Sequence, residues 1–263
     1  MARKTYSLNS EKILISSLGY FKEKVTFGAE LEFYSLKPLE LENLNLFLRS
    51  FDKNIKVVKE DGENQFEIIF PPFNDALNLA NLIDKVKNNL TDITFSAKPF
   101  INQPSSGLHF NFSFPNKDFF ENNFKYIIQG LIKYLKESLV YFCPSDNDYT
   151  RFTNKADLHS PKNISWGFNN RSTAIRVPPP NENCDVKRIE HRISSPNANP
   201  YLAISVILYA AKFGIDEQLL PPEPTYGIAS NEQYFKEVLP QTYLEALNYN
   251  INSKIQWHML MSL

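Results

Sequence analysis

Several short segments of this 263-residue chain place acidic, imidazole or guanidinium side chains at alternate positions. Hard divalent cations bind carboxylate oxygens, often together with an imidazole nitrogen. Pairs of such cations serve phosphoryl transfer because they bridge phosphate oxygens. The residues whose types and spacing suit cation binding are Glu30, Glu32, Glu67, His109 and Glu190.

A group of arginines lies in the second half of the chain, at Arg171, Arg176, Arg188 and Arg192. Their planar guanidinium groups suit phosphates and carboxylates. Acids that hold cations, cations that hold phosphates and arginines that neutralise the remaining charge would together suit nucleotide chemistry. Residue types alone leave other interpretations open. A Glu-x-Glu pair also fits a solvated strand face, a single histidine fits a structural role, and Arg-x-Glu-x-Arg fits a ladder of ion pairs between strands.

The same alternation predicts the strands that position these side chains. In residues 25–34 apolar side chains alternate with Glu30 and Glu32, so the two acids share the face opposite the apolar one. The expected strands are 25–34, 64–70, 108–114, 164–168, 173–177 and 188–193. Apolar stripes and capping residues predict helices at about 75–90, 118–140 and 199–213, and most of the chain beyond 224 is expected to be helical.

This order of elements predicts an α+β fold with a curved, mainly antiparallel sheet. Helices are expected to cover one apolar face, which leaves the acids, arginines and histidine on the other. We expect residues 1–24 to be an N-terminal extension and residues 25–263 to form one catalytic domain.

The composition of the chain limits the classes of binding partner that we expect. The formal net charge of -1 gives no electrostatic reason to bind nucleic acid or an anionic membrane. The sequence contains no apolar run long enough for a membrane-spanning helix. We therefore expect a cytoplasmic protein whose partners are neither nucleic acids nor membranes.

Motifs in a consistent order resemble the catalytic domain of glutamine synthetases and their γ-glutamyl-amine ligase relatives. The resemblance runs from about residue 27 to about residue 253 and includes an Asn-Arg-Ser-x-x-Ile-Arg-x-Pro and an Arg-x-Glu-x-Arg pattern. The segments that carry it are GAELEF (28–33), EDGENQFE (60–67), SSGLHFN (105–111), DYTRF (148–152), NRSTAIRVP (170–178), RIEHR (188–192), ANPYL (198–202) and LPQTYLEAL (239–247).

The resemblance implies a glutamine-synthetase-like catalytic fold with at least two Mg²⁺ or Mn²⁺ ions and ATP as co-substrate. One cation site would use Glu32, Glu60 and Glu67, with Glu63 as an alternative to Glu60. The second would use Glu30, His109 and Glu190.

The resemblance also implies roles for the arginines. Arg151 and Arg192, with Gly107, would bind the amino-acid substrate, and Arg171, Arg176 and Arg188 would face the ATP phosphates. Among these, Arg188 and Arg176 are the expected nucleotide-binding residues, and Arg171 and Arg176 are also expected to be catalytic. In the family, these groups help the side-chain carboxylate of glutamate to take the terminal phosphate of ATP. Ammonia or an amine then attacks the γ-glutamyl phosphate.

The sequence departs from the family pattern in several places. Residues 1–24 do not supply the small β-rich N-terminal domain, which in the family completes a neighbouring subunit's site. Pro104 and Asn111 replace an asparagine and a second histidine. The flap glutamate has no direct counterpart. We take Asp157 as the catalytic acid, with His159 as the alternative, and either would change how the nucleophile loses its proton.

The resulting hypothesis is an ATP-dependent carboxylate–amine ligase that uses glutamate or a similar acid and ammonia or an amine. One alternative is a non-catalytic nucleotide- and metal-binding module of the same fold, which acts as a sensor or partner. Another is phosphorylation of a small acid without amide formation. A monomer, a dimer and a ring of catalytic domains all remain open, so a homo-oligomer is one option.

Overall fold

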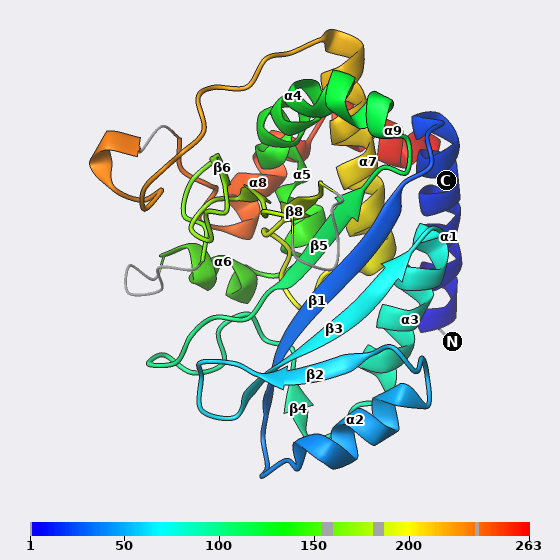
Figure 1. The fold of residues 1–263 in the computed structure, drawn as a ribbon, viewed down its shortest axis with the longest axis vertical. Helices are drawn as coiled ribbons and strands as arrows, with labels where there is room; N and C mark the ends of the chain where they lie inside the picture. Colours follow the sequence, from blue (N-terminus) through cyan, green and yellow to red (C-terminus); the bar gives the residue numbers. More distant parts are fainter. Residues whose placement is uncertain (1, 154–159, 181–186, 235–236) are drawn as a thin grey trace.

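Seven strands pair in the order β2-β3-β1-β5-β8-β7-β6, and β4 joins the same sheet beside β1 (Figure 1). The computed structural model describes residues 2–153, 160–180, 187–234 and 237–263. Within these residues every pair of strands is antiparallel except β6 with β7. The strands are β1 (Thr26–Ser35), β2 (Lys56–Lys59), β3 (Gln65–Phe73), β4 (Ile93–Thr94), β5 (Leu108–Ser113), β6 (Trp166–Phe168), β7 (Ile175–Val177) and β8 (Ile189–His191).

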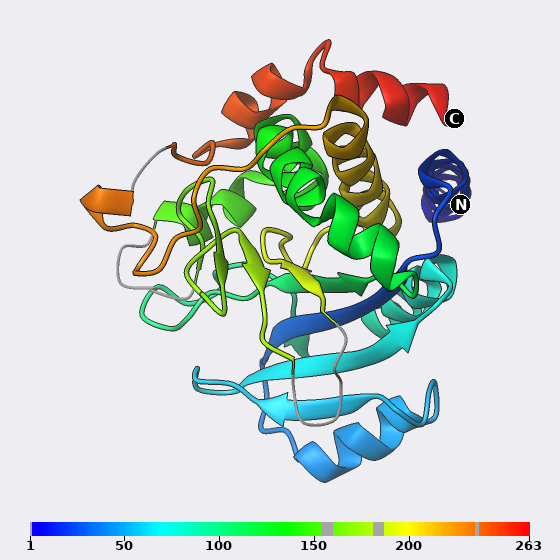
Figure 2. The same cartoon turned by 45° about the horizontal axis from the view of Figure 1, so that its top comes forward.

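Helices α1, α3 and α7 pack together along one side of this sheet, with α1 beside α7, whereas α2 lies beside β2 (Figure 2). Asn199 caps α7 by accepting from the backbone N–H groups of Tyr201 and Leu202, and Asp75 caps α3 in the same way. The helices are α1 (Ala2–Phe21), α2 (Leu41–Arg49), α3 (Ala76–Asn89), α4 (Lys117–Lys133), α5 (Leu135–Phe142), α6 (Asp146–Thr153), α7 (Pro200–Glu217), α8 (Tyr243–Asn250) and α9 (Lys254–Met261), with a 3₁₀ turn at Glu232–Tyr234. The expected α+β class with a mainly antiparallel sheet is confirmed.

The single helix expected over 118–140 is wrong, because the chain forms two helices there. Tyr134 leaves the helical conformation between α4 and α5, and its hydroxyl donates to Glu217 at the end of α7. Apolar periodicity continues across such a break, so it does not reveal it. The elements α1, α2, β2, β4 and α6 were not predicted. Four of them are short, polar or at an edge of the structure. The fifth, α1, has no distinct apolar face in its sequence.

Alternation along β1 separates a buried apolar face from a polar one. Phe27, Leu31 and Phe33 are fully buried, whereas Glu30 and Glu32 on the opposite face keep partial access to solvent. Each fully buried side chain of this size contributes roughly 1.5–3 kcal/mol of hydrophobic stabilisation. The apolar face is therefore anchored to the helices, and the polar face of the same strand is held in one orientation.

Helices α4 and α7 cross at a pair of glycines. A Cβ atom on Gly214 of α7 would lie 2.1 Å from the carbonyl oxygen of Tyr126 and 2.7 Å from the Cα of Gly130 on α4. The backbones can approach this closely only because neither residue has a side chain. Among the described helices, none is long and apolar enough to cross a membrane.

The glycine crossing yields a stability prediction. We expect Gly214→Ala to lower the free energy of unfolding by about 3 kcal/mol, because a methyl group cannot fit without moving a helix backbone. Gly19→Ala is the matched control, since a Cβ at Gly19, also helical, meets nothing within 4 Å. We expect the control to be neutral or to stabilise by up to about 1 kcal/mol. Urea denaturation measures both, and equal values would contradict the prediction.

Candidate active site

The pairing register of the sheet brings the acidic side chains of neighbouring strands face to face. Glu32 on β1 is directly opposite Glu67 on β3. Glu30, two residues earlier on β1, is opposite His109 on β5. Residues directly opposite on one face have Cβ atoms roughly 5 Å apart. Carboxylates distant in the sequence thus meet on the polar face, and the Glu32–Glu67 pair is a like-charge contact.

Glu190 joins this face from β8, where it is opposite Asn111 on β5 and Arg176 on β7. Its carboxylate is buried and forms ion pairs with two arginines. Arg176 Nη1 lies 2.7 Å from Glu190 Oε2, and Arg192 Nη1 contacts Oε1. Burial by itself raises the pKa of Glu190, but the nearby positive charges, above all Arg192, outweigh burial and hold that pKa below 4.5. Glu190 is therefore an ionised carboxylate.

A cavity of about 300 Å³ on this face collects nearly all the predicted site residues. Its lining comprises Glu30, Glu32, Glu60, Glu67, Ser105, His109, Arg151, Ser160, Arg171, Arg176, Arg188, Glu190 and Arg192. The structure places Glu60 at this cavity, whereas Glu63 is exposed to solvent and does not line it. Asp157 and His159 lie outside the described residues.

Gly107 lies next to three residues that line the cavity, namely Glu32, His109 and Arg151. Its backbone N–H donates to Glu32 Oε2 at 2.8 Å, and Glu32 N–H donates to the Gly107 carbonyl at 2.9 Å. A Cβ at this position would lie 2.7 Å from His109 Nε2 and 2.8 Å from Arg151 Nη2. Glycine is thus required here because the imidazole and the guanidinium occupy the space of a side chain.

The three carboxylates contributed by β1, β3 and the loop between β2 and β3 destabilise one another's charge. Burial, followed by repulsion from the neighbouring acids, raises the pKa of Glu67 to about 9. Burial also raises the pKa of Glu32 to about 7, with repulsion from Glu60 adding to it. The pKa of Glu60 is raised by burial and by Asp61. A group of half-buried acids with raised pKa values would be stabilised by bound cations.

The donor set on β1, β5 and β8 also suits a cation. Glu30, His109 and Glu190 can each offer a ligand atom, and these atoms lie within 4.8 Å of one another. Burial, together with the positive charge of Arg192, holds the pKa of His109 well below its ordinary value. The imidazole is therefore neutral, which is the form that binds metals. Two carboxylates and a neutral imidazole fit a divalent cation such as Mn²⁺ or Mg²⁺.

The arginines of the cavity differ in how many of their N–H donors already bond to other protein groups. Arg151 is buried, and its Nη1 donates to the carbonyls of Ile193 and Ser194 at 2.8 Å each. Arg176 and Arg192 are paired with Glu190, as described above. Arg171, by contrast, is exposed and forms no hydrogen bond or ion pair with any residue that the structure describes. Arg171 is thus the arginine most available to an anionic ligand.

Some residues that shape the site escaped the sequence reasoning. Gln65, the first residue of β3, is buried; its Nε2 donates to the Ser105 carbonyl and to Ser106 Oγ, and its Oε1 accepts from the Gly62 N–H, so it joins the loop before β3 to the loop before β5. Ser105 and Ser160 lie in loops where no periodic signal could have identified them. Asn111 was noted only as a departure from a family pattern. Asn111 lies two residues after His109 and therefore shares its strand face. This alternation could have identified Asn111 as a site residue.

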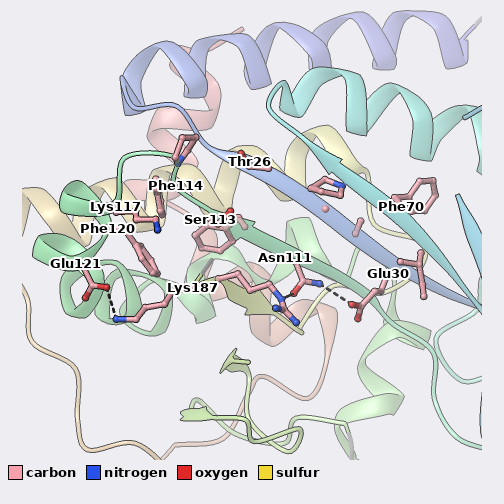
Figure 3. A pocket seen from close by; sticks show the side chains of 17 residues that line it. Thr26, Glu30, Phe70, Asn111, Ser113, Phe114, Lys117, Phe120, Glu121 and Lys187 are labelled. Carbon is pink, nitrogen blue, oxygen red and sulfur yellow. Dashed lines mark hydrogen bonds and ion pairs between the residues drawn. The ribbon is translucent and has the colours of Figure 1, made fainter. Parts of the chain in front are cut away.

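A second, larger cavity of about 800 Å³ adjoins the first along β1 and β5 (Figure 3). Its walls include the aromatic rings of Phe114 and Phe120 and the ion pair between Lys187 and Glu121. Glu30 and Arg188 line both cavities. The polar face therefore offers one strongly charged compartment and one largely apolar compartment with a common wall.

Comparison with known proteins finds a match between residues 41–260 and the family model "Glutamine synthetase, catalytic domain". The chain is 27% identical over 242 residues to the glutamine synthetase of Sulfolobus acidocaldarius, which covers 81% of this chain and 51% of that protein. It is also 27% identical over 242 residues to the gamma-glutamylputrescine synthetase PuuA of Escherichia coli, covering 80% and 50%. A third relative, the glutamine synthetase of Thermus thermophilus, is 32% identical over 213 residues, covering 72% and 47%.

Among solved structures, the fold is similar to that of "Apo GmaS without ligand", with a TM-score of 0.75 and 23% sequence identity. The match covers 95% of this chain and 69% of that one. The chain spans about half the length of the curated relatives it matches.

The raised pKa of Glu67 makes a prediction about stability in the absence of cations. Its pKa is about 9 in the folded protein against an ordinary 4.5, so the folded state binds a proton that the unfolded chain has lost. The stability that this proton confers is complete below about pH 4.5 and is lost as the pH rises through about 9. Glu67→Gln removes this loss. We expect the variant to melt like wild type near pH 4.5 and at a higher temperature at about pH 8.

Thermal unfolding followed by circular dichroism, with a chelator present, measures this difference. Glu63→Gln is the matched control, because Glu63 is exposed and outside the cavity, and it should melt like wild type throughout. Adding Mn²⁺ should stabilise wild type more than Glu67→Gln, since a bound ion replaces the proton. Equal melting temperatures of Glu67→Gln and wild type at about pH 8 would contradict the electrostatic account.

Proposed function

The chain belongs to the family of glutamine synthetase catalytic domains, and on this basis we propose that it is an ATP-dependent carboxylate–amine ligase. Its proposed acid substrate is glutamate or a similar acid, activated at the side-chain carboxylate, and its nitrogen substrate is ammonia or an amine. The observation that carries this proposal is the pair of adjoining cavities with Glu30 and Arg188 in their common wall. One cavity suits the charged reacting groups and the other suits the rest of a nucleotide.

The larger cavity is the proposed nucleotide site. Rings at Phe114 and Phe120, next to Pro115, offer an apolar surface against which a planar base can pack. Arg188, at the boundary with the charged cavity, is placed to meet the phosphates, and its Nε donates to Asn111 at 3.3 Å. A nucleotide that lies along β1 and β5 would thus direct its terminal phosphate into the acidic cavity.

The charged cavity is the proposed reaction site, with cations held by its acids and imidazole. We assign one cation to Glu30, His109 and Glu190 and another to Glu32, Glu60 and Glu67. Bound Mg²⁺ or Mn²⁺ would neutralise the negative charge that otherwise keeps a carboxylate from approaching a phosphate. The raised pKa values of Glu32 and Glu67 support this assignment, because they are the mark of acids brought together without a counter-charge.

The proposed reaction has two steps. A side-chain carboxylate oxygen of the acid attacks the γ-phosphorus of ATP, and the bond from phosphorus to the ADP oxygen breaks. The amine nitrogen then attacks the carbonyl carbon of the resulting acyl phosphate. The carbon–oxygen bond breaks, phosphate leaves, and the nitrogen gives up a proton. Asp157 remains our candidate for accepting that proton.

The arginines divide the remaining work in this proposal. Arg171 and Arg188 keep donors available and would stabilise the charge that develops on the transferred phosphoryl group. Arg176 would contribute to the same phosphates while orienting Glu190. Arg192 and Arg151 would face the acid substrate, although Arg151 already uses Nη1 for backbone carbonyls. Gly107 would assist substrate binding by keeping Arg151 and His109 in place.

An assay of ADP release tests the proposal. The reaction contains Mg²⁺ or Mn²⁺, ATP, glutamate and one of a panel of amines, with ammonia included. We expect amine-dependent release of ADP and formation of an amide, detected by mass spectrometry. ATP and Mn²⁺ binding without turnover for any amine would instead favour a non-catalytic binding module. ADP release that needs no amine would favour simple phosphorylation of the acid.

Matched variants tie any turnover to the acidic cavity. We expect Glu60→Gln to lower the rate by about a hundredfold or more, because it removes a charge on which the phosphoryl transfer depends. Glu63→Gln lies three positions away on the exposed side of the loop and should keep nearly the wild-type rate. The reverse result would assign the ligand to Glu63.

Gly28 tests the nucleotide site separately. It is opposite Asn111 and lines the larger cavity, yet a Cβ there would make only ordinary contacts, the nearest 3.6 Å from the Phe70 carbonyl oxygen. The fold therefore tolerates a side chain that would project into the cavity. We expect Gly28→Leu to weaken ATP binding at least about tenfold by calorimetry, because the side chain takes the ligand's volume.

Gly28→Ala is the control for this substitution and should bind ATP with an affinity closer to wild type. Both variants should keep the wild-type melting temperature to within a few degrees and should still bind Mn²⁺. Wild-type ATP affinity in Gly28→Leu would exclude the larger cavity as the nucleotide site.

A further inference from the structure

Asn111 occupies the boundary between the two cavities and uses both ends of its amide there. Its Nδ2 donates to Glu30 Oε1 at 3.1 Å, and its Oδ1 accepts from Arg188 Nε at 3.3 Å. Figure 3 shows the Asn111 amide next to the Glu30 carboxylate, with the hydrogen bond between them dashed. The two residues it joins are the ones that line both cavities. Asn111 is thus hydrogen-bonded to each member of the common wall.

The amide also keeps opposite charges apart. Without it, the Glu30 carboxylate and the Arg188 guanidinium would face each other across the same strand surface, and electrostatic attraction would favour a direct ion pair. Such a pair would occupy the carboxylate that a cation needs and the guanidinium that a phosphate needs. An amide satisfies one donor and one acceptor without adding charge, so both groups stay available.

We propose that Asn111 is a positioning residue that couples cation binding in the charged cavity to nucleotide binding in the larger one. Asn111 holds Glu30 and Arg188 at a set spacing. A cation bound to Glu30 and the guanidinium of Arg188 would then contact oxygens of the same phosphate. This inference rests on the proposed function. It names one residue through which each ligand strengthens the binding of the other. The cation raises the affinity for the nucleotide by the same factor as the nucleotide raises the affinity for the cation.

The test measures this coupling in binding experiments, with no turnover needed. Calorimetry gives the affinity of the intact protein for a non-hydrolysable ATP analogue with and without saturating Mn²⁺, and the ratio is the coupling factor. We expect Asn111→Ala to lower the factor about tenfold, as the loss of a hydrogen bond to a charged group implies. Asn111→Asp keeps the side-chain volume but presents a negative oxygen to Glu30, and we expect a similar loss.

Asn111→Asp separates positioning from space-filling, because its side chain fills the same volume but its ionised carboxylate cannot donate to Glu30. It also carries the test if Asn111→Ala does not fold. Asn88→Ala is the control, since Asn88 is exposed on α3 and its amide donates to the Asp84 carbonyl of the same helix. It should keep the wild-type factor.

The outcomes separate this inference from the proposed function. A wild-type protein that binds neither Mn²⁺ nor the analogue overturns the proposed function and the inference together. A wild-type protein that binds both, with an unchanged coupling factor in folded Asn111→Asp, overturns the inference alone. A reduced factor in Asn111→Asp with an unchanged factor in Asn88→Ala supports it.

Discussion

Two carboxylates on adjacent strands, Glu32 and Glu67, are forced to face each other by the pairing register of the sheet. Like charges in this position destabilise a sheet, and burial makes the repulsion stronger. The polar face cannot relieve the strain by sliding, because a shift of one residue would expose the buried phenylalanines on the other face. The acidic site thus exists because the apolar core on the reverse of the sheet stabilises a register that the acids alone would not adopt.

The rest of the molecule can be understood as support for this arrangement. Helices packed on the apolar face supply the hydrophobic stabilisation, and the close crossing of α4 and α7 at Gly130 and Gly214 brings them together. On the polar face, two arginines pair directly with Glu190 and hold its pKa low, whereas the acids near β3 keep raised pKa values because burial outweighs the arginines near them. On one side of the charged cavity, arginines therefore neutralise the Glu190 carboxylate. On the other side, bound cations would stabilise the ionised acids.

Function in this chain is proposed to depend on two compartments with a shared wall, and on one neutral side chain within that wall. Binding sites gain when charged groups are held apart and ready, since ligands then need not break an internal ion pair. Asn111 has that position, and a histidine in its place would carry a different balance of donor and acceptor. The chain spans about half the length of the curated relatives it matches.

The sequence by itself determined the strands of the polar face, their alternation and the family. Period-two patterns identified β1, β3, β5 and β8 closely, because each strand has one buried apolar face. Most candidate ligands were identified from the same patterns and from ordered motifs. Local patterns could not show that Tyr134 interrupts a helix, or that the short edge strand β2 exists. Only the tertiary structure decided which acids meet and that Glu60 rather than Glu63 lines the cavity. It also decided that Arg151 bonds to backbone carbonyls, whereas Arg171 bonds to none of the described residues. The physical reason is that a strand's own periodicity fixes which face a side chain takes, whereas cross-strand register and loop closure, which no local window contains, fix its neighbours.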